Sequence, residues 1–131
     1  IVSSSFDQIE AWMKDQSNRR YRRKILEVME YIDANLNRKL TLKEIADSIG
    51  MNESSLSRLF KNETGVNLNY YINEKKMKKA MELLRGESSM IKDVAAAVGM
   101  DDQLYFNKVF KKYYNVSPSE FKKKLHPDTE E

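Results

Sequence analysis

The apolar residues of this 131-residue chain recur at the spacing of amphipathic helices, and the clearest pair of helices lies between Thr41 and Lys61. Thr41 and Glu44 have the spacing of a capping box, which predicts a helix start, and Gly50 supplies the left-handed residue that ends a helix. Asn52 is placed to cap a second helix. The two apolar stripes consist of Leu42, Ile45, Ala46 and Ile49, followed by Leu56, Leu59 and Phe60. The pattern predicts a helix-turn-helix unit.

The other face of the second predicted helix is small, polar and basic. It carries Ser54, Ser57, Arg58 and Lys61, which recur at i, i+3, i+4 and i+7. A helix that lies in the major groove of DNA presents a face of this kind.

A second copy of the pattern follows at residues 91–121. It aligns with residues 42–71 at an offset of 49 up to the turns Gly50-Met51 and Gly99-Met100, and at an offset of 50 after them. Gly65, which ends the first unit's second helix, falls on Asn115, the residue that adopts the left-handed conformation most readily after glycine. The repeat therefore predicts two helix-turn-helix units.

In the second unit we expect Asp101 to take the capping role of Asn52. The side chains expected to face inward are Phe106, Val109, Phe110 and Tyr113, and those expected to face outward are Leu104, Asn107, Lys108 and Lys111. The sequence Ser117-Pro118-Ser119-Glu120 reads as a capping box with proline at the first helical position, so a short final helix follows.

Helices are also predicted before and between the two units. The first runs from Tyr21 to Asn35, with Tyr31 and Leu36 expected in the first lobe's core. A long connector helix begins after Asn67 and ends near Arg85, with Gly86 as its stop. Its four lysines are interpreted mostly as a solvated surface, with one or two reaching phosphates; they are Lys75, Lys76, Lys78 and Lys79. The fold class is all-α, with about seven helices in two helix-turn-helix lobes joined by a long connector helix.

Charge is distributed unevenly along the chain. The net charge is +3, but residues 19–125 hold 22 Lys and Arg against 14 Asp and Glu, a surplus of eight positive charges. A basic body suits a polyanionic partner. The basic run at Arg19–Lys24 is either a solvated linker or a source of phosphate contacts, for which Arg22 and Arg23 are the candidates.

Composition argues against catalysis and against a membrane segment. Cysteine is absent and His126 is the single histidine, so thiol chemistry is excluded and no cofactor or metal site is expected. The longest run of apolar or small residues, VAAAVGM, is far below the roughly 18 residues that span a bilayer. No signal peptide is recognised, so a cytoplasmic setting is expected.

With both repeats in view, residues 40–125 resemble the DNA-binding domain of the AraC/XylS family of transcription regulators. The motifs that carry the resemblance are LTLxxIA from Leu40, SRLFK from Ser57, ETG from Glu63, AxxVG from Ala95, YFxxVFKK from Tyr105 and VSPSEF from Val116. The resemblance implies two recognition helices in successive major-groove segments of double-stranded promoter DNA. It also implies regulation, mostly activation, through contact with RNA polymerase.

By motif position, the resemblance assigns base contacts to Ser54, Ser57, Arg58, Gln103, Leu104, Asn107 and Lys108. Side-chain chemistry suggests that Arg58 pairs with guanine and Gln103 with adenine, and that Leu104 either meets a thymine methyl or packs against its neighbours. An ammonium group supplies charge with little base discrimination, so the same chemistry favours phosphate contacts for lysines. The lysines concerned are Lys61, Lys108, Lys111 and Lys112.

The expected domains are a tail of an upstream linker or coupling helix (1–20), the double helix-turn-helix domain (21–125) and a frayed end (126–131). Because the chain begins with Ile1, we expect a longer protein whose upstream sensing or receiver domain is absent here. The alternative function is a protein-docking module, since a fold alone does not fix function. Docking would require an exposed apolar patch on the outward faces.

Overall fold

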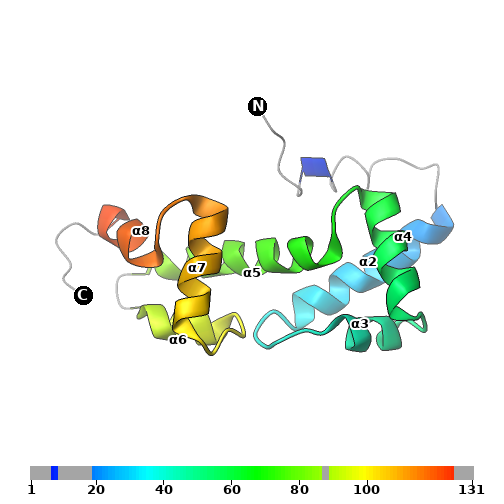
Figure 1. Cartoon of the computed structure of the whole chain (residues 1–131), viewed down its shortest axis with the longest axis horizontal. Coiled ribbons are helices and arrows are strands. Elements are labelled where there is room, and N and C mark those ends of the chain that lie inside the picture. The colour runs from blue at the N-terminus through cyan, green and yellow to red at the C-terminus, as the bar shows by residue number, and fades with distance from the viewer. Residues whose placement is uncertain (1–6, 9–18, 87–88, 126–131) are drawn as a thin grey trace. The chain divides into compact units, whose positions relative to one another are not determined.

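The computed structural model describes residues 7–8, 19–86 and 89–125, and these ranges contain seven α-helices and no strand (Figure 1). The helices are α2 (Arg19–Ala34), α3 (Leu42–Ser48), α4 (Glu53–Thr64), α5 (Leu68–Leu84), α6 (Ile91–Ala97), α7 (Gln103–Tyr114) and α8 (Pro118–Leu125). The predicted all-α fold with two helix-turn-helix units is confirmed. Most of the predicted tail at 1–20 and all of the tail at 126–131, including His126, lie outside the described residues.

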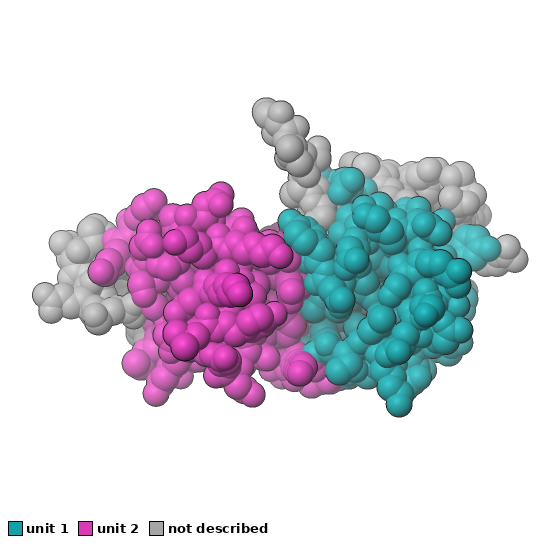
Figure 2. All heavy atoms as spheres, in the orientation of Figure 1, with its two compact units in different colours: residues 1–35, 40–72 teal, residues 36–39, 73–131 magenta. Residues whose placement is uncertain are grey.

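The chain forms two compact units, which Figure 2 colours separately. Unit 1 consists of residues 1–35 and 40–72, and unit 2 consists of residues 36–39 and 73–131. Helix α5 therefore contributes residues 68–72 to unit 1 and residues 73–84 to unit 2.

Unit 1 is built on a core shared by α2, α3 and α4. The side chains with no exposed surface are Ile25, Val28, Ile32, Ile45, Leu56 and Phe60. The predicted capping box is present: Thr41 Oγ1 accepts from the Glu44 N–H at 3.2 Å, and Glu44 Oε1 accepts from the Thr41 N–H at 2.9 Å. The other carboxylate oxygen of Glu44 accepts from the Tyr31 hydroxyl at 3.0 Å, which ties α2 to the start of α3.

The turn between α3 and α4 has the predicted geometry. Gly50 has φ +70°, and Asn52 Oδ1 accepts from the Ser55 N–H at 2.8 Å. At the other end of α4, Gly65 has φ +77° and its N–H donates to the Lys61 carbonyl at 2.8 Å. These caps fix which residues of α4 face solvent, because they set where the helix begins and ends.

Unit 2 repeats this plan around an aromatic core. Phe110 packs against the rings of Phe106, Tyr114 and Phe121, with ring centroids 4.9 to 6.0 Å apart. Asn115 has φ +63°, so it adopts the left-handed conformation that was predicted from its alignment with Gly65. Ser117 Oγ caps α8 by accepting from the Glu120 N–H at 3.1 Å.

The cap of α7 is Asp102, so the prediction of Asp101 is wrong. Asp102 Oδ1 accepts from the backbone N–H groups of Leu104 and Tyr105, at 3.0 and 3.3 Å. The reason is the change of offset in the repeat: after the Gly-Met turn the offset is 50, which aligns Asn52 with Asp102 and leaves Asp101 as the additional residue of the turn.

Lys76 corrects the interpretation of the connector lysines as a mostly solvated surface. Its side chain is 4% exposed, and its ammonium donates to the carbonyl oxygens of Leu36, Arg38 and Val98 at 3.0, 2.7 and 2.8 Å. All three N–H groups therefore have an acceptor. Burial, with smaller contributions from the charges of Arg38 and Lys79, lowers the pKa of Lys76 from 10.5 to about 8, so the charged form still prevails at neutral pH.

Two other details differ from expectation. Helix α2 ends at Ala34, and Leu36 belongs to unit 2 rather than to the first lobe's core, because residues 36–39 are held by Lys76. Gly86 follows the end of α5 by two residues and does not have a positive φ, so it is not a left-handed cap.

Candidate nucleic-acid interface

The outward side of α4 presents the side chains predicted for the first unit. Ser54, Arg58 and Lys61 are exposed and Ser57 is half-buried, whereas Leu56 and Phe60 are buried beneath them. Lys61 lies in the last turn of the helix, where its Nζ donates to the Gly65 carbonyl at 3.2 Å. The predicted separation of a polar face from an apolar face is therefore present.

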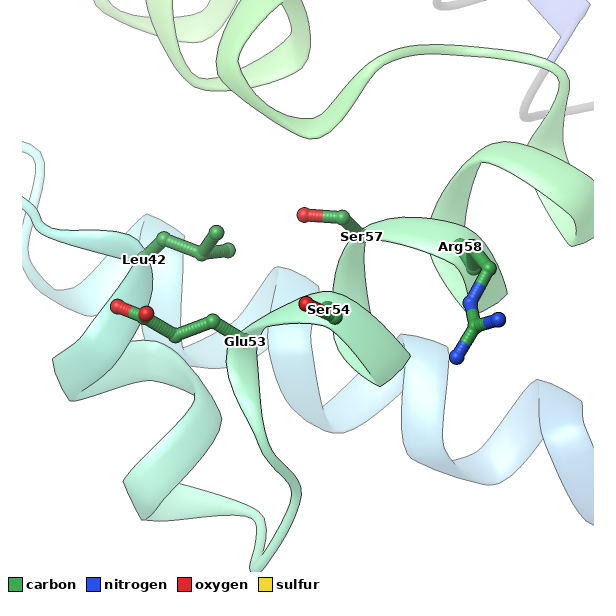
Figure 3. Close-up of a pocket in the computed structure, with 5 residues that line it drawn as sticks. All are labelled: Leu42, Glu53, Ser54, Ser57 and Arg58. Carbon is green, nitrogen blue, oxygen red and sulfur yellow. The ribbon is translucent and has the colours of Figure 1, made fainter.

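A shallow hollow of about 620 Å³ lies on this face of unit 1. Its lining is Leu42 of α3 with Glu53, Ser54, Ser57 and Arg58 of α4. Figure 3 shows Glu53 extending toward Leu42, while the Arg58 side chain extends away from that end. The hollow thus brings together a carboxylate, two hydroxyls and a guanidinium, which are the groups that pair with base edges in the major groove.

Glu53 was missed by the sequence interpretation. It is the first residue of α4, directly after the Asn52 cap. The N-terminal residues of a recognition helix are the ones that contact base edges, so its position next to the cap was a usable signal. A carboxylate there is suited to accept from the amino group of cytosine.

Helix α7 presents Gln103 and Leu104 at its exposed N-terminal end. Leu104 is 81% exposed, the highest value among the large apolar side chains that the structure describes, so the alternative in which it packs against neighbours is wrong. Lys108, Lys111 and Lys112 are exposed along the same helix.

Asn107 differs from its neighbours on α7. It was expected to face outward, but it is half-buried, and its Oδ1 oxygen is fully buried without a hydrogen-bond partner among the described residues. The carboxamide is short, so packing around the helix covers its oxygen, whereas the longer Lys108 side chain reaches solvent.

The two arginines predicted for phosphate contact lie in the first turns of α2. Arg23 is exposed, and Arg22 is half-buried and already engaged with a neighbour. Both arginines belong to unit 1, whereas the lysines of α7 belong to unit 2.

The described residues were also compared with the requirements of a metal site and of a membrane-spanning helix. They contain no cluster of three or more His, Asp or Glu side chains that would hold a metal ion. Among the same residues, no helix combines the length and apolar character needed to cross a membrane.

Comparison with known proteins identifies regulators of operons among the relatives of this chain. A family model described as a helix-turn-helix domain matches residues 45–124. The Msm operon regulatory protein of Streptococcus mutans is 29% identical over 111 residues, which cover 85% of this chain and 40% of that protein. The lactose operon transcription activator of Staphylococcus xylosus is 32% identical over 98 residues, which cover 75% of this chain and 35% of that protein.

Solved structures share the fold. The C-terminal domain of AraT, a response regulator from Geobacillus stearothermophilus, aligns with a TM-score of 0.75 at 30% identity and covers 82% of this chain and 91% of that domain. By contrast, this chain spans less than half the length of the two curated relatives described above.

Proposed function

Because the chain belongs to the AraC/XylS family of helix-turn-helix transcription regulators, we propose that it binds double-stranded DNA sequence-specifically, with α4 and α7 in successive major-groove segments. DNA binding and transcription regulation are the common properties of this family's domain.

The observation that carries the proposal is the outward face of α4. Ser54, Ser57 and Arg58 line one open hollow above a closed apolar core, so their polar groups lie on the outside of the unit and not in its core. In this proposal Arg58 makes a bidentate contact with guanine, and the two serines make the shorter contacts beside it.

Helix α7 reads the second segment through Gln103 and Leu104. Gln103 is exposed at the first helical position, where it can pair with adenine, and the exposed Leu104 meets a thymine methyl. Asn107 contributes less than its neighbours, because its side chain is half-buried and its carboxamide oxygen is covered.

The backbone contacts are proposed for cations around these faces. They are Lys61, Lys111, Lys112, Arg22 and Arg23. The proposed DNA-binding domain comprises residues 21–125. The upstream segment would couple this domain to a sensing or receiver part. The whole regulator would activate transcription by contacting RNA polymerase; one of the relatives described above is itself a transcription activator.

A selection from a random duplex library, followed by titration of the winner against salt, tests the proposal. Two short enriched elements about 10 base pairs apart, with steep loss of binding as salt rises, are expected. Absence of both enrichment and salt-sensitive binding would contradict it.

One observation favours a second candidate function, a protein-docking module. Leu104 and Tyr105 are 81% and 51% exposed at the start of α7, so two large side chains with apolar surface are open to a partner there. The basic side chains that follow on the same helix favour DNA instead. Retention on random duplex with release by salt separates the two candidates.

Replacing Arg58 with alanine is expected to weaken specific binding by about 1–3 kcal/mol and to relax preference at one base pair, because a bidentate guanine contact is lost. Competition between duplexes that differ at single positions measures both effects. Arg85→Ala, which removes the same charge from the turn after α5, is the control. An unchanged base preference in Arg58→Ala would show that this arginine does not read a base.

Replacing Lys111 with alanine is expected to weaken binding to all duplexes equally and to reduce the salt slope by about 1, because one phosphate contact is lost. Titrations of one duplex at several salt concentrations give the slope. Lys124→Ala in α8 is the charge-matched control. A slope equal to that of the unchanged protein would rule out the contact.

A further inference from the structure

A second hollow, of about 350 Å³, lies on unit 2 along one side of α7. We call it the α7 notch. Its lining is Asn73 of α5 with Tyr105, Lys108, Val109, Lys112 and Tyr113 of α7. The α7 residues are spaced i, i+3, i+4, i+7 and i+8, so they form one continuous stripe of the helix. Val109 is buried, and the polar side chains surround it.

The lining of the notch is cationic. It holds two ammonium groups, one amide and two phenol hydroxyls, and no carboxylate is part of it. Neither Lys108 nor Lys112 makes a hydrogen bond or ion pair to another described residue. Two uncompensated charges one helical turn apart, with neutral donors beside them, suit an anion with several acceptor oxygens.

The repeat provides an internal comparison. At the offset of 50, the notch residues of α7 correspond in α4 to Ser55, Arg58, Leu59, Asn62 and Glu63. The α4 stripe therefore has one cation and one acid where α7 has two cations and no acid. The hollow of unit 1 also contains the Glu53 carboxylate, which would repel a phosphate but can accept a hydrogen bond from a base. The notch is thus specific to the second unit.

We propose that the α7 notch binds one backbone phosphate of the DNA duplex, with Lys108 and Lys112 as its charged contacts and Asn73 and Tyr105 as neutral donors. This inference rests on the proposed function. It places Lys108 among the phosphate contacts rather than the base contacts, so base reading by α7 falls to its first turn. An ammonium group is a point charge without a fixed donor geometry, which suits a phosphate better than a base edge.

The test combines replacement of both lysines in the protein with removal of the charge from single phosphates in the DNA. In the duplex selected from the library, each phosphate in turn is replaced by an uncharged methylphosphonate, and binding is measured for the protein and for Lys108→Gln/Lys112→Gln. We expect one position at which neutralisation weakens binding by the unchanged protein roughly tenfold but leaves binding by the double variant unaffected. The control Lys123→Gln/Lys124→Gln in α8 removes the same charge and should keep the tenfold effect.

Two outcomes would overturn the inference while leaving the proposed function intact. In the first, neutralising that phosphate weakens binding by the double variant as strongly as it weakens binding by the unchanged protein. In the second, the double variant has an altered preference at one base pair, which would mean that Lys108 contacts a base. Failure of the proposed function gives a different result, because the unchanged protein would then show no salt-sensitive binding to any duplex.

Discussion

Replacing Gly99 with alanine is expected to destabilise the protein by roughly 2–5 kcal/mol, the sum of a left-handed backbone strain and an overlap with a neighbouring chain segment. Gly99 has φ +72°, and a Cβ there would lie 2.6 Å from the Arg38 carbonyl oxygen and 2.7 Å from its Cα. These atoms are backbone atoms, so no side-chain rotation relieves the overlap. Urea unfolding of the two proteins measures the difference.

Gly50 is the matched control for this prediction. It occupies the same place in the first helix-turn-helix and has nearly the same φ, +70°, but a Cβ there would have no neighbour within 4 Å. Gly50→Ala should therefore show the strain alone, about 1 kcal/mol. Equal destabilisation of the two variants would mean that residues 36–39 yield to the added methyl group.

Replacing Lys76 with methionine is expected to cost about 3 kcal/mol of unfolding free energy. Methionine fills a similar space, but it cannot donate to the carbonyl oxygens of Leu36, Arg38 and Val98. Hydrogen bonds from a charged donor contribute about 1.5–3 kcal/mol each in net terms, and part of this gain is offset by the cost of burying the ammonium.

Lys78→Met separates this effect from simple loss of charge. Lys78 is exposed on the same helix two residues later, so its replacement should change the unfolding free energy by less than about 1 kcal/mol. Thermal and urea unfolding are the measurements. If the unfolding free energy of Lys76→Met were within about 0.5 kcal/mol of the value for the unchanged protein, the usual size of a surface effect, the three hydrogen bonds would have no net value.

The features predicted well from sequence are those fixed by near neighbours. The capping box at Thr41, the Asn52 cap and the left-handed Gly65 and Asn115 depend on residues within four positions. A short window of sequence is therefore enough to predict these caps and turns. The mistaken cap at Asp101 has the same origin, because two adjacent aspartates both satisfy the local rule and only the repeat offset distinguishes them.

The features missed depend on residues far apart in the chain. The acceptors of Lys76 are 22 to 40 positions away, and no local pattern identifies them. In a run of connector lysines, a buried member looks like an exposed one. The same reason applies to Leu36, which was expected in the first lobe's core but whose carbonyl accepts from Lys76 of unit 2.

For the candidate site, periodicity predicted which side of each helix faces outward but not what lies beside it. The contributions of Leu42 and Asn73 to the two hollows come from other helices, so they required the packing of α3 and α5. The burial of the Asn107 oxygen likewise depends on packing. The individual base and phosphate contacts remain predictions.

The assignment of residues 36–39 to unit 2 has a consequence for how the protein can be divided. The polypeptide passes from one unit to the other after residues 35, 39 and 72, so neither unit is a single uninterrupted stretch. A fragment ending at Ile72 would retain the carbonyls of Leu36 and Arg38 but lose the ammonium that binds them. The sequence repeat records two similar halves, yet proteolysis or gene truncation at one point would not release two intact modules.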